Sequence, residues 1–276
     1  MIFRIVMITV IALTAACSGD PSAADKREQA QKHYRSTNTV IPASNEIISF
    51  PALANPSDSR PASNPNRNAY FGDLHVHTTL SFDASAFGTT ATPTDAYRYA
   101  QGEAIKHPSG FEVQLAQPLD FYAVTDHAVM LGLINEAADT RTTFSQYDIA
   151  KPYHNINESV KGGLLDLAKR SKVFNNFISD VVANLLDGTF DNDVVNDALK
   201  SAWIQTVEAA DAAYKPGTFT TFAGYEFTSS TEEREALHRN VIFRGTERLP
   251  AQPFSRFNSI NPEGLWDWMD ELRLQN

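Results

Sequence analysis

Two histidines separated by one residue, His75 and His77, are followed six residues later by Asp83. Imidazole nitrogens and carboxylate oxygens together are typical ligands of zinc, iron and manganese. On an extended strand alternate side chains share a face, and two steps of about 3.3 Å put them roughly 6–7 Å apart. One metal ion can bridge that span. The segment therefore indicates a metal site in which Asp83 adds a carboxylate from the following loop.

Three further polar side chains stand at the edges of apolar segments. His127 follows the apolar run 119–125, Glu226 ends the apolar run 219–225, and His238 precedes a run that begins at residue 239. A carboxylate next to so apolar a segment needs a positively charged partner if it is buried. We expect a metal to be that partner, with Glu226 bridging two ions and His127 and His238 as ligands.

Two neighbours of these ligands are candidates for catalytic roles. Asp126 precedes His127 and could orient it, or the substrate, through a hydrogen bond; its alternative role is a helix N-cap. Arg239 follows His238 and offers a guanidinium to an anionic substrate. We expect the remaining histidines to be surface residues, namely His33, His107 and His154.

The elements that must position these residues can be read from the apolar pattern. We expect strands at 69–77, 119–125, 219–227 and 239–244, and a short strand near 46–50. A helix should begin at Pro93 with Thr92 as its N-cap and run to about residue 103. In α/β folds active sites form where strands meet their following loops, which is where most of these candidates stand.

Apolar residues recur at helical spacing through much of 157–214, which predicts helices broken at Gly188 and a helical insertion over this range. A last helix is expected at about 263–272. Strands that alternate with helices favour an α/β fold of the parallel type. With about four core strands, we expect an incomplete barrel and a chain that continues in a longer protein.

The composition excludes some classes of protein. The 276 residues carry a net charge of −10, whereas nucleic-acid-binding domains normally present a basic surface. There is one cysteine, so neither an intrachain disulfide nor a cysteine-rich zinc finger is possible. We therefore expect a small-molecule substrate, no nucleic acid, and a metal site built from imidazole and carboxylate.

The N-terminus has the layout of an export signal. Residues 1–17 contain one basic residue, Arg4, then a short apolar run and small residues before Cys17. The segment 13–17 resembles a bacterial lipoprotein processing site, which would make Cys17 a lipid-anchored N-terminus. The polar, proline-containing stretch 18–68 predicts a disordered tether. We expect an exported protein, either periplasmic or anchored to a membrane through that lipid.

Three short motifs resemble a known family. The segments 73–78 (DLHVHT), 125–127 (TDH) and 224–226 (GYE) are similar to the first motifs of the polymerase-and-histidinol-phosphatase (PHP) superfamily of metal-dependent phosphoesterases. The stretches around 70–78, 222–229 and 238–250 look especially like an exported bacterial branch of unknown function. The resemblance covers about residues 69–276 and implies a distorted (β/α) barrel with two or three zinc, manganese or iron ions.

Carried onto this sequence, the resemblance implies that His75 and His77 bind one metal, that Glu226 bridges two, and that His238 holds the second. Asp83 and His127 would lie at the third, although the family often has a histidine where Asp83 stands. The family's later motifs, another histidine and a near-terminal Asp-x-His, do not occur before residue 276. We therefore expect this chain to bind metal less well than the complete protein.

Metal-assisted hydrolysis of a phosphoester is the reaction that these expectations favour. Two alternatives remain open. The same ligands could serve hydrolysis of another bond, such as an ester or an amide, or the fold could be retained as a binding or scaffold domain without catalysis. The sequence shows neither a phosphate-binding glycine-rich loop nor the motif of a serine hydrolase.

Overall fold

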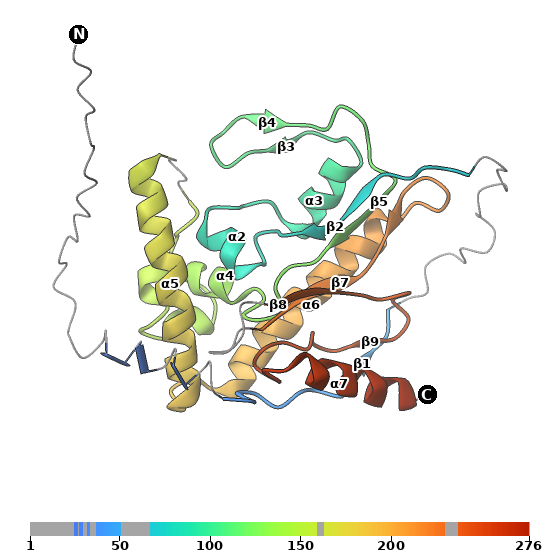
Figure 1. Ribbon diagram of the computed structural model, residues 1–276. Coiled ribbons are helices and arrows are strands. Elements are labelled where there is room, and N and C mark those ends of the chain that lie inside the picture. Colours follow the sequence, from blue (N-terminus) through green and yellow to red (C-terminus); the bar gives the residue numbers. More distant parts are fainter. Residues whose placement is uncertain are drawn as a thin grey trace, which may run out of the picture.

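The computed structural model describes residues 25–26, 28–29, 32–33, 37–50, 67–158, 163–229 and 237–275. The expected export signal at 1–17 and most of the expected tether lie outside these ranges. None of the described helices combines the length and the apolar character needed to cross a membrane. The described residues form a mixed α/β fold, which confirms the expected class at this level (Figure 1).

Three parallel strands form the sheet that carries the candidate site, in the order β2–β5–β6. Their bounds are β2 Gly72–Val76, β5 Phe121–Val124 and β6 Thr220–Thr221. A parallel bridge between His127 and Glu226 then joins the end of β5 to the next strand, β7. The expected strand 219–227 is therefore split at 222–223 into β6 and β7.

The other strands make small antiparallel pairs. The pairs are β7 (Gly224–Ser229) with β8 (Leu237–Ile242), β3 (Ile105–Lys106) with β4 (Glu112–Val113), and β1 (Ile47–Ile48) with β9 (Leu249–Pro250). The expected strand 239–244 thus begins earlier than predicted and includes His238. The strands of the described ranges close into no barrel, so the expected barrel type is not established by this arrangement.

Within the described ranges, six α-helices accompany the strands: α2 Phe82–Ala86, α3 Pro93–Ala100, α4 Leu133–Ala138, α5 Leu164–Leu186, α6 Asn192–Ala213 and α7 Pro262–Leu274. Two short 3₁₀ turns, η2 Phe144–Gln146 and η3 Lys151–Tyr153, follow α4. The expected start of α3 is confirmed, because Thr92 caps the helix and forms a capping box with Asp95. Helix α5 ends just before Gly188, which has a positive φ of 75°.

Helix α6 packs on the sheet beside α3, as Figure 1 shows. Its residues Ala209, Ala210 and Ala213 belong to one apolar cluster with Tyr97 of α3 and Val124 of β5. Its Trp203 is fully buried in the main core. Helix α6 therefore forms part of the core. Helix α5 contributes Phe177, Val181 and Val182 to the main core, so both helices of the expected insertion 157–214 pack into the domain.

The segment 37–50 was expected to be part of a disordered tether, but it packs against α7, β9 and the main core. Ile41 is buried in the main core and its N–H donates to the carbonyl of Phe257. The expected short strand near 46–50 is present as β1. The indole of Trp268 in α7 donates to the carbonyl of Ser44. These contacts tie 37–50 into the domain.

Candidate metal centre

The candidate ligands meet where β2, β5 and β7 lie next to one another. His75 and His77 come from the end of β2, His127 follows β5 by three residues, and Glu226 is the third residue of β7. Because β2 and β5 are parallel and the bridge between His127 and Glu226 is parallel too, these residues come to the same edge. His238 reaches this edge from β8, opposite Thr228 in the hairpin register.

The six expected ligands form three overlapping groups. Within each group, one ligand atom per residue lies within 4.8 Å of the others: His75, His77 and Glu226; His77, Asp83 and His127; His127, Glu226 and His238. Each of the residues His77, His127 and Glu226 belongs to two groups. Each group has the ligand types and spacing that could hold a metal ion, and neighbouring groups share residues.

Glu226 is the centre of this cluster. It is 0% exposed, although its carboxylate lies next to four imidazoles. Its Oε2 lies 2.7 Å from His77 Nε2 and 3.2 Å from His75 Nε2. Its Oε1 contacts His238 Nδ1. A buried carboxylate needs compensating positive charge, and among the described residues imidazoles are its ion-pairing partners. A donor set of this kind fits a divalent cation.

Asp83 closes the second group from the first turn of α2. Its Oδ1 lies 3.3 Å from His77 Nδ1, and its Oδ2 lies 3.4 Å from His127 Nε2. The ring of Phe82 lies 5.3 Å, between centroids, from the ring of His127. The short helix α2 was not expected from the sequence, and its start is what directs Asp83 toward the histidines.

Two hydroxyl groups hold the ligands in place, and the sequence analysis assigned a role to neither. Ser81 Oγ donates to Asp83 Oδ1 at 2.6 Å, lies 3.1 Å from His77 Nδ1 and accepts the backbone N–H of His127. Thr228 Oγ1 lies 2.7 Å from His127 Nδ1. A ring nitrogen engaged in this way fixes the tautomer of the imidazole. Thr228 stands two residues after Glu226, so on a strand the two side chains share a face. That spacing is the sequence feature from which the role of Thr228 could have been predicted.

Asp126 is placed differently from the expected role. Its carboxylate is buried and accepts hydrogen bonds from the N–H of Thr78 at 2.5 Å and from the hydroxyl of Thr78 at 2.7 Å. Burial raises the pKa of Asp126 to about 6, and the Thr78 donors oppose that rise. Asp126 therefore fixes the backbone directly after His77 and belongs to none of the three groups.

The structure does not bring Arg239 into the cluster. Arg239 pairs with Phe227 across the hairpin, whereas His238 pairs with Thr228. Neighbouring residues of a strand point to opposite faces, so Arg239 lies on the face opposite His238. Its guanidinium donates to the carbonyl of His238 at 2.7 Å, and the residue is exposed. The described geometry gives it no position over the ligands.

The electrostatics of the cluster are those of paired opposite charges. Burial alone would lower the pKa of His77, but the carboxylates of Asp83 and Glu226 outweigh it and raise the pKa to about 10. Burial alone would raise the pKa of Glu226, yet the hydrogen bond to His77 and the nearby imidazoles lower it to about 2. The pKa of Asp83 is likewise held well below its usual range. Both carboxylates are thus ionised at neutral pH.

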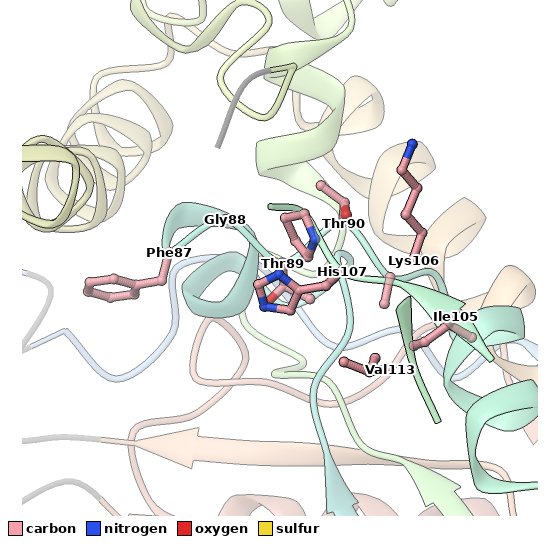
Figure 2. Close-up of a pocket in the computed structure, with 10 residues that line it drawn as sticks. Phe87, Gly88, Thr89, Thr90, Ile105, Lys106, His107 and Val113 are labelled. Atoms are coloured by element: carbon pink, nitrogen blue, oxygen red, sulfur yellow. The ribbon is translucent and has the colours of Figure 1, made fainter. Parts of the chain in front are cut away.

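A cavity of about 280 Å³ lies beside α2. Its wall comes from residues 87–91 after α2 and from the β3–β4 hairpin (Figure 2). Phe87 is four residues from Asp83, which is about 6 Å along a helix. The imidazole of His107 stacks on Phe111 at a centroid distance of 4.2 Å, as expected for a residue outside the cluster. Figure 2 shows Phe87 and Lys106 extending away from the other lining side chains.

Fold and site together define a class: a mixed α/β protein whose parallel strands end at a candidate polynuclear metal centre of histidines and carboxylates. The chain belongs to the family DUF3604, proteins of unknown function, whose model matches residues 64–276. The matched range contains all six candidate ligands. Comparisons with curated proteins and with solved structures give no significant match.

Proposed function

We propose that this protein is an exported metal-dependent hydrolase that cleaves a phosphoester at the cluster. The buried carboxylate of Glu226, placed against four imidazoles, is the observation that carries the proposal. A purely structural cluster would not need three overlapping donor groups at one exposed strand edge. Export rests on the signal-like segment 1–17 and on the resemblance of 13–17 to a lipoprotein processing site.

The donor groups give each ligand a role. His75, His77 and Glu226 would hold one ion, His127, Glu226 and His238 a second, and Asp83 a third together with His77 and His127. Zinc, manganese or iron suits this mixture of nitrogen and oxygen donors. When bound, such ions lower the pKa of water and neutralise charge that develops on oxygen. Ser81 and Thr228 would keep the imidazoles oriented, and Asp126 would fix the segment that follows His77.

A phosphoester is favoured over other bonds for two reasons. The three motifs resemble those of the PHP superfamily of phosphoesterases, and that resemblance also supports a distorted barrel in the complete fold. A net charge of −10 gives no general attraction for an anion, so local cations must bind it. A polynuclear centre provides them.

Metal content is the first test. We expect the purified whole chain, prepared without chelator, to contain at least one divalent metal ion per molecule by elemental analysis. Glu226→Gln keeps the shape of the side chain but removes the charge shared by two groups, so metal content should fall by more than half. Asp83→Asn should reduce it less, because Asp83 belongs to one group.

His107→Ala is the matched control for this experiment, since it removes an imidazole outside the cluster and should leave metal content unchanged. A folded wild-type chain that contains no metal, and that takes up none from added zinc, manganese or iron, would refute the proposal. Metal that is retained by Glu226→Gln would place the site elsewhere.

Activity assays on different substrates decide which kind of bond the protein hydrolyses. The metal-loaded chain should hydrolyse members of a panel of phosphomonoesters and phosphodiesters, and Glu226→Gln should lower the rate by about 100-fold or more. Turnover of carboxylic esters or amides with no turnover of phosphoesters would favour a hydrolase of another bond. Metal binding without turnover of either panel would favour a binding domain.

A further inference from the structure

A second cavity lies away from the metal centre, at the other end of β7. It has a volume of about 230 Å³, and its wall comes from the last turn of α6, residues 220–223 and the loop after β8. Ala223 in this wall precedes Glu226 by three residues, which is about 10 Å along an extended chain. None of the six candidate metal ligands lines it. The cavity is therefore a separate site.

Two buried polar atoms of residues in this wall, Oδ1 of Asp211 and Oγ1 of Thr246, meet no partner with full hydrogen-bond geometry among the described residues. The Thr246 hydroxyl lies close enough to the Asp211 carboxylate to lower its pKa, but not in good alignment with it. Thr246 is only 5% exposed. A buried polar atom left unsatisfied carries a free-energy cost. A ligand in the cavity that donates hydrogen bonds to both atoms would remove that cost.

The electrostatics of the wall favour a cation. Asp211 lies in the last turn of α6, where the helix end carries partial negative charge and no basic side chain is present. Glu247 adds a second carboxylate. Burial, opposed by the nearby Thr246 hydroxyl, raises the pKa of Asp211, and Glu247 raises it further. Arg244 also lines the cavity but is exposed, and in the described ranges it forms an ion pair with neither carboxylate.

The remaining wall selects an organic cation over a bare metal ion. Tyr214, Phe222 and Phe243 line the cavity. Aromatic rings attract cations and pack against carbon chains. A water molecule takes up about 30 Å³ in the liquid, so a cavity of about 230 Å³ is far larger than one metal ion needs. An ammonium group with a short carbon chain matches both the size and the lining.

We propose that this cavity binds a primary ammonium group, carried by a free amine or by a lysine side chain. An ammonium has three N–H donors. Two of them would bond Asp211 Oδ1 and Thr246 Oγ1, and the third would face Glu247. The aromatic residues would pack on the attached carbons. This site lies outside the metal cluster and does not depend on hydrolase activity.

Calorimetry with the whole chain, in the presence of a chelator, tests the proposal. Phenethylamine should bind, whereas 2-phenylethanol, which has the same shape without the charge, should bind at least about tenfold more weakly because it lacks the charge-assisted hydrogen bonds. Nα-acetyl-lysine amide separates the two sources. Binding of phenethylamine alone indicates a site for free amines, and binding of both indicates one that also accepts lysine side chains.

Three variants locate the binding. Asp211→Asn should weaken phenethylamine binding by at least about tenfold, and Thr246→Val should weaken it severalfold. Thr246→Val also removes an unsatisfied hydroxyl, so it should fold as well as the wild type. Glu208→Gln, an exposed carboxylate on the same helix, is the matched control and should bind normally.

Three results would overturn the proposal. The first is the absence of phenethylamine binding at millimolar concentration. The second is equal binding of 2-phenylethanol, which would make this an apolar cavity only. The third is displacement of the amine by calcium or magnesium ions, which would show that the cavity is a metal-ion site. This titration is run without chelator on the Glu226→Gln variant, in which the metal centre is disabled.

Discussion

Ser81 shows how much of the candidate centre depends on a residue that binds no metal itself. Its hydroxyl contacts Asp83, His77 and the backbone of His127, and the residue is 0% exposed. One buried hydroxyl therefore connects three segments of the cluster. Hydrogen bonds of this kind orient metal ligands, and their loss typically lowers metal affinity by about 10–100-fold.

Ser81→Ala should therefore weaken metal binding by about 10–100-fold while the chain stays folded. Ser85→Ala is the matched control, because Ser85 is equally buried on the same short helix but bonds Asn135 instead of the cluster. A competition titration with a zinc-sensitive dye measures both variants. Equal affinity of Ser81→Ala and Ser85→Ala would show that the hydroxyl does not position the ligands.

The charges of the cluster make a prediction about pH. His77 has its pKa raised from 6.5 to about 10, so in metal-free protein its stabilising effect is complete below pH 6.5 and is lost as pH rises toward 10. Burial raises the pKa of Asp126 from 3.8 to about 6, so ionisation of Asp126 destabilises the folded state as pH rises through that range. The lowered pKa of Glu226 stabilises the fold above its ordinary value of 4.5 and matters only in acid.

We therefore expect the free energy of unfolding of chelator-treated protein, measured with urea, to fall between pH 6.5 and pH 9. Metal must displace the proton of His77, so metal affinity should rise over the same interval, by roughly tenfold per pH unit for one released proton. His77→Gln should flatten both trends. Stability that rises with pH in metal-free wild type would contradict the charge pairing.

At the scale of elements, the centre depends on how the β7–β8 hairpin meets β2. The hairpin register places His238 opposite Thr228. From β7, the carboxylate of Glu226 contacts His75 and His77. From β8, the side-chain amide of Asn240 donates to the carbonyl of Leu74 at 2.7 Å, which is a second link to the strand that carries the first two histidines.

Asn240→Ala should loosen this link and leave the six paired positions of the hairpin intact. We expect the group that contains His238 to lose affinity severalfold, so that the weakest-bound metal leaves first in a chelator titration. Arg239→Ala, at the neighbouring position on the opposite face, is the control for metal content. Unchanged metal release in Asn240→Ala would show that the core alone holds the hairpin in place.

At the scale of the whole molecule, the described domain is larger than the family match. Residues 37–50 lie outside the matched range 64–276 and yet pack against α7, β9 and the main core. Lys200 on α6 also pairs with Glu46 at 2.9 Å. The segment therefore connects α6 and α7, which are far apart in the sequence.

Ile41→Ala should lower the free energy of unfolding by about 2–5 kcal/mol, because it leaves a cavity in the core. Ile47→Ala, at a half-buried position of β1, should cost clearly less. Urea denaturation monitored by tryptophan fluorescence measures both, since Trp268 bonds this segment. Equal stability of Ile41→Ala and the wild type would show that 37–50 is dispensable for the fold.

The sequence alone determined the types and chain positions of the six candidate ligands, the mixed α/β class and the capped start of α3. These depend on local rules: alternation along strands, helical spacing and the chemistry of a cap. Local rules also predicted β2 and β5 near their observed positions. They do not say which strand ends meet, so they could not give the contacts that place Glu226 next to four imidazoles.

The tertiary structure decided what depends on contacts between distant segments. It placed the carboxylate of Asp126 on Thr78 and Arg239 away from the cluster. It also made α6 part of the core and ordered 37–50, whose polar composition favours disorder when considered alone. Burial of Ile41 and the bonds to Phe257 and Trp268 supply the free energy that local composition lacks. Such energies arise only after distant segments have packed together.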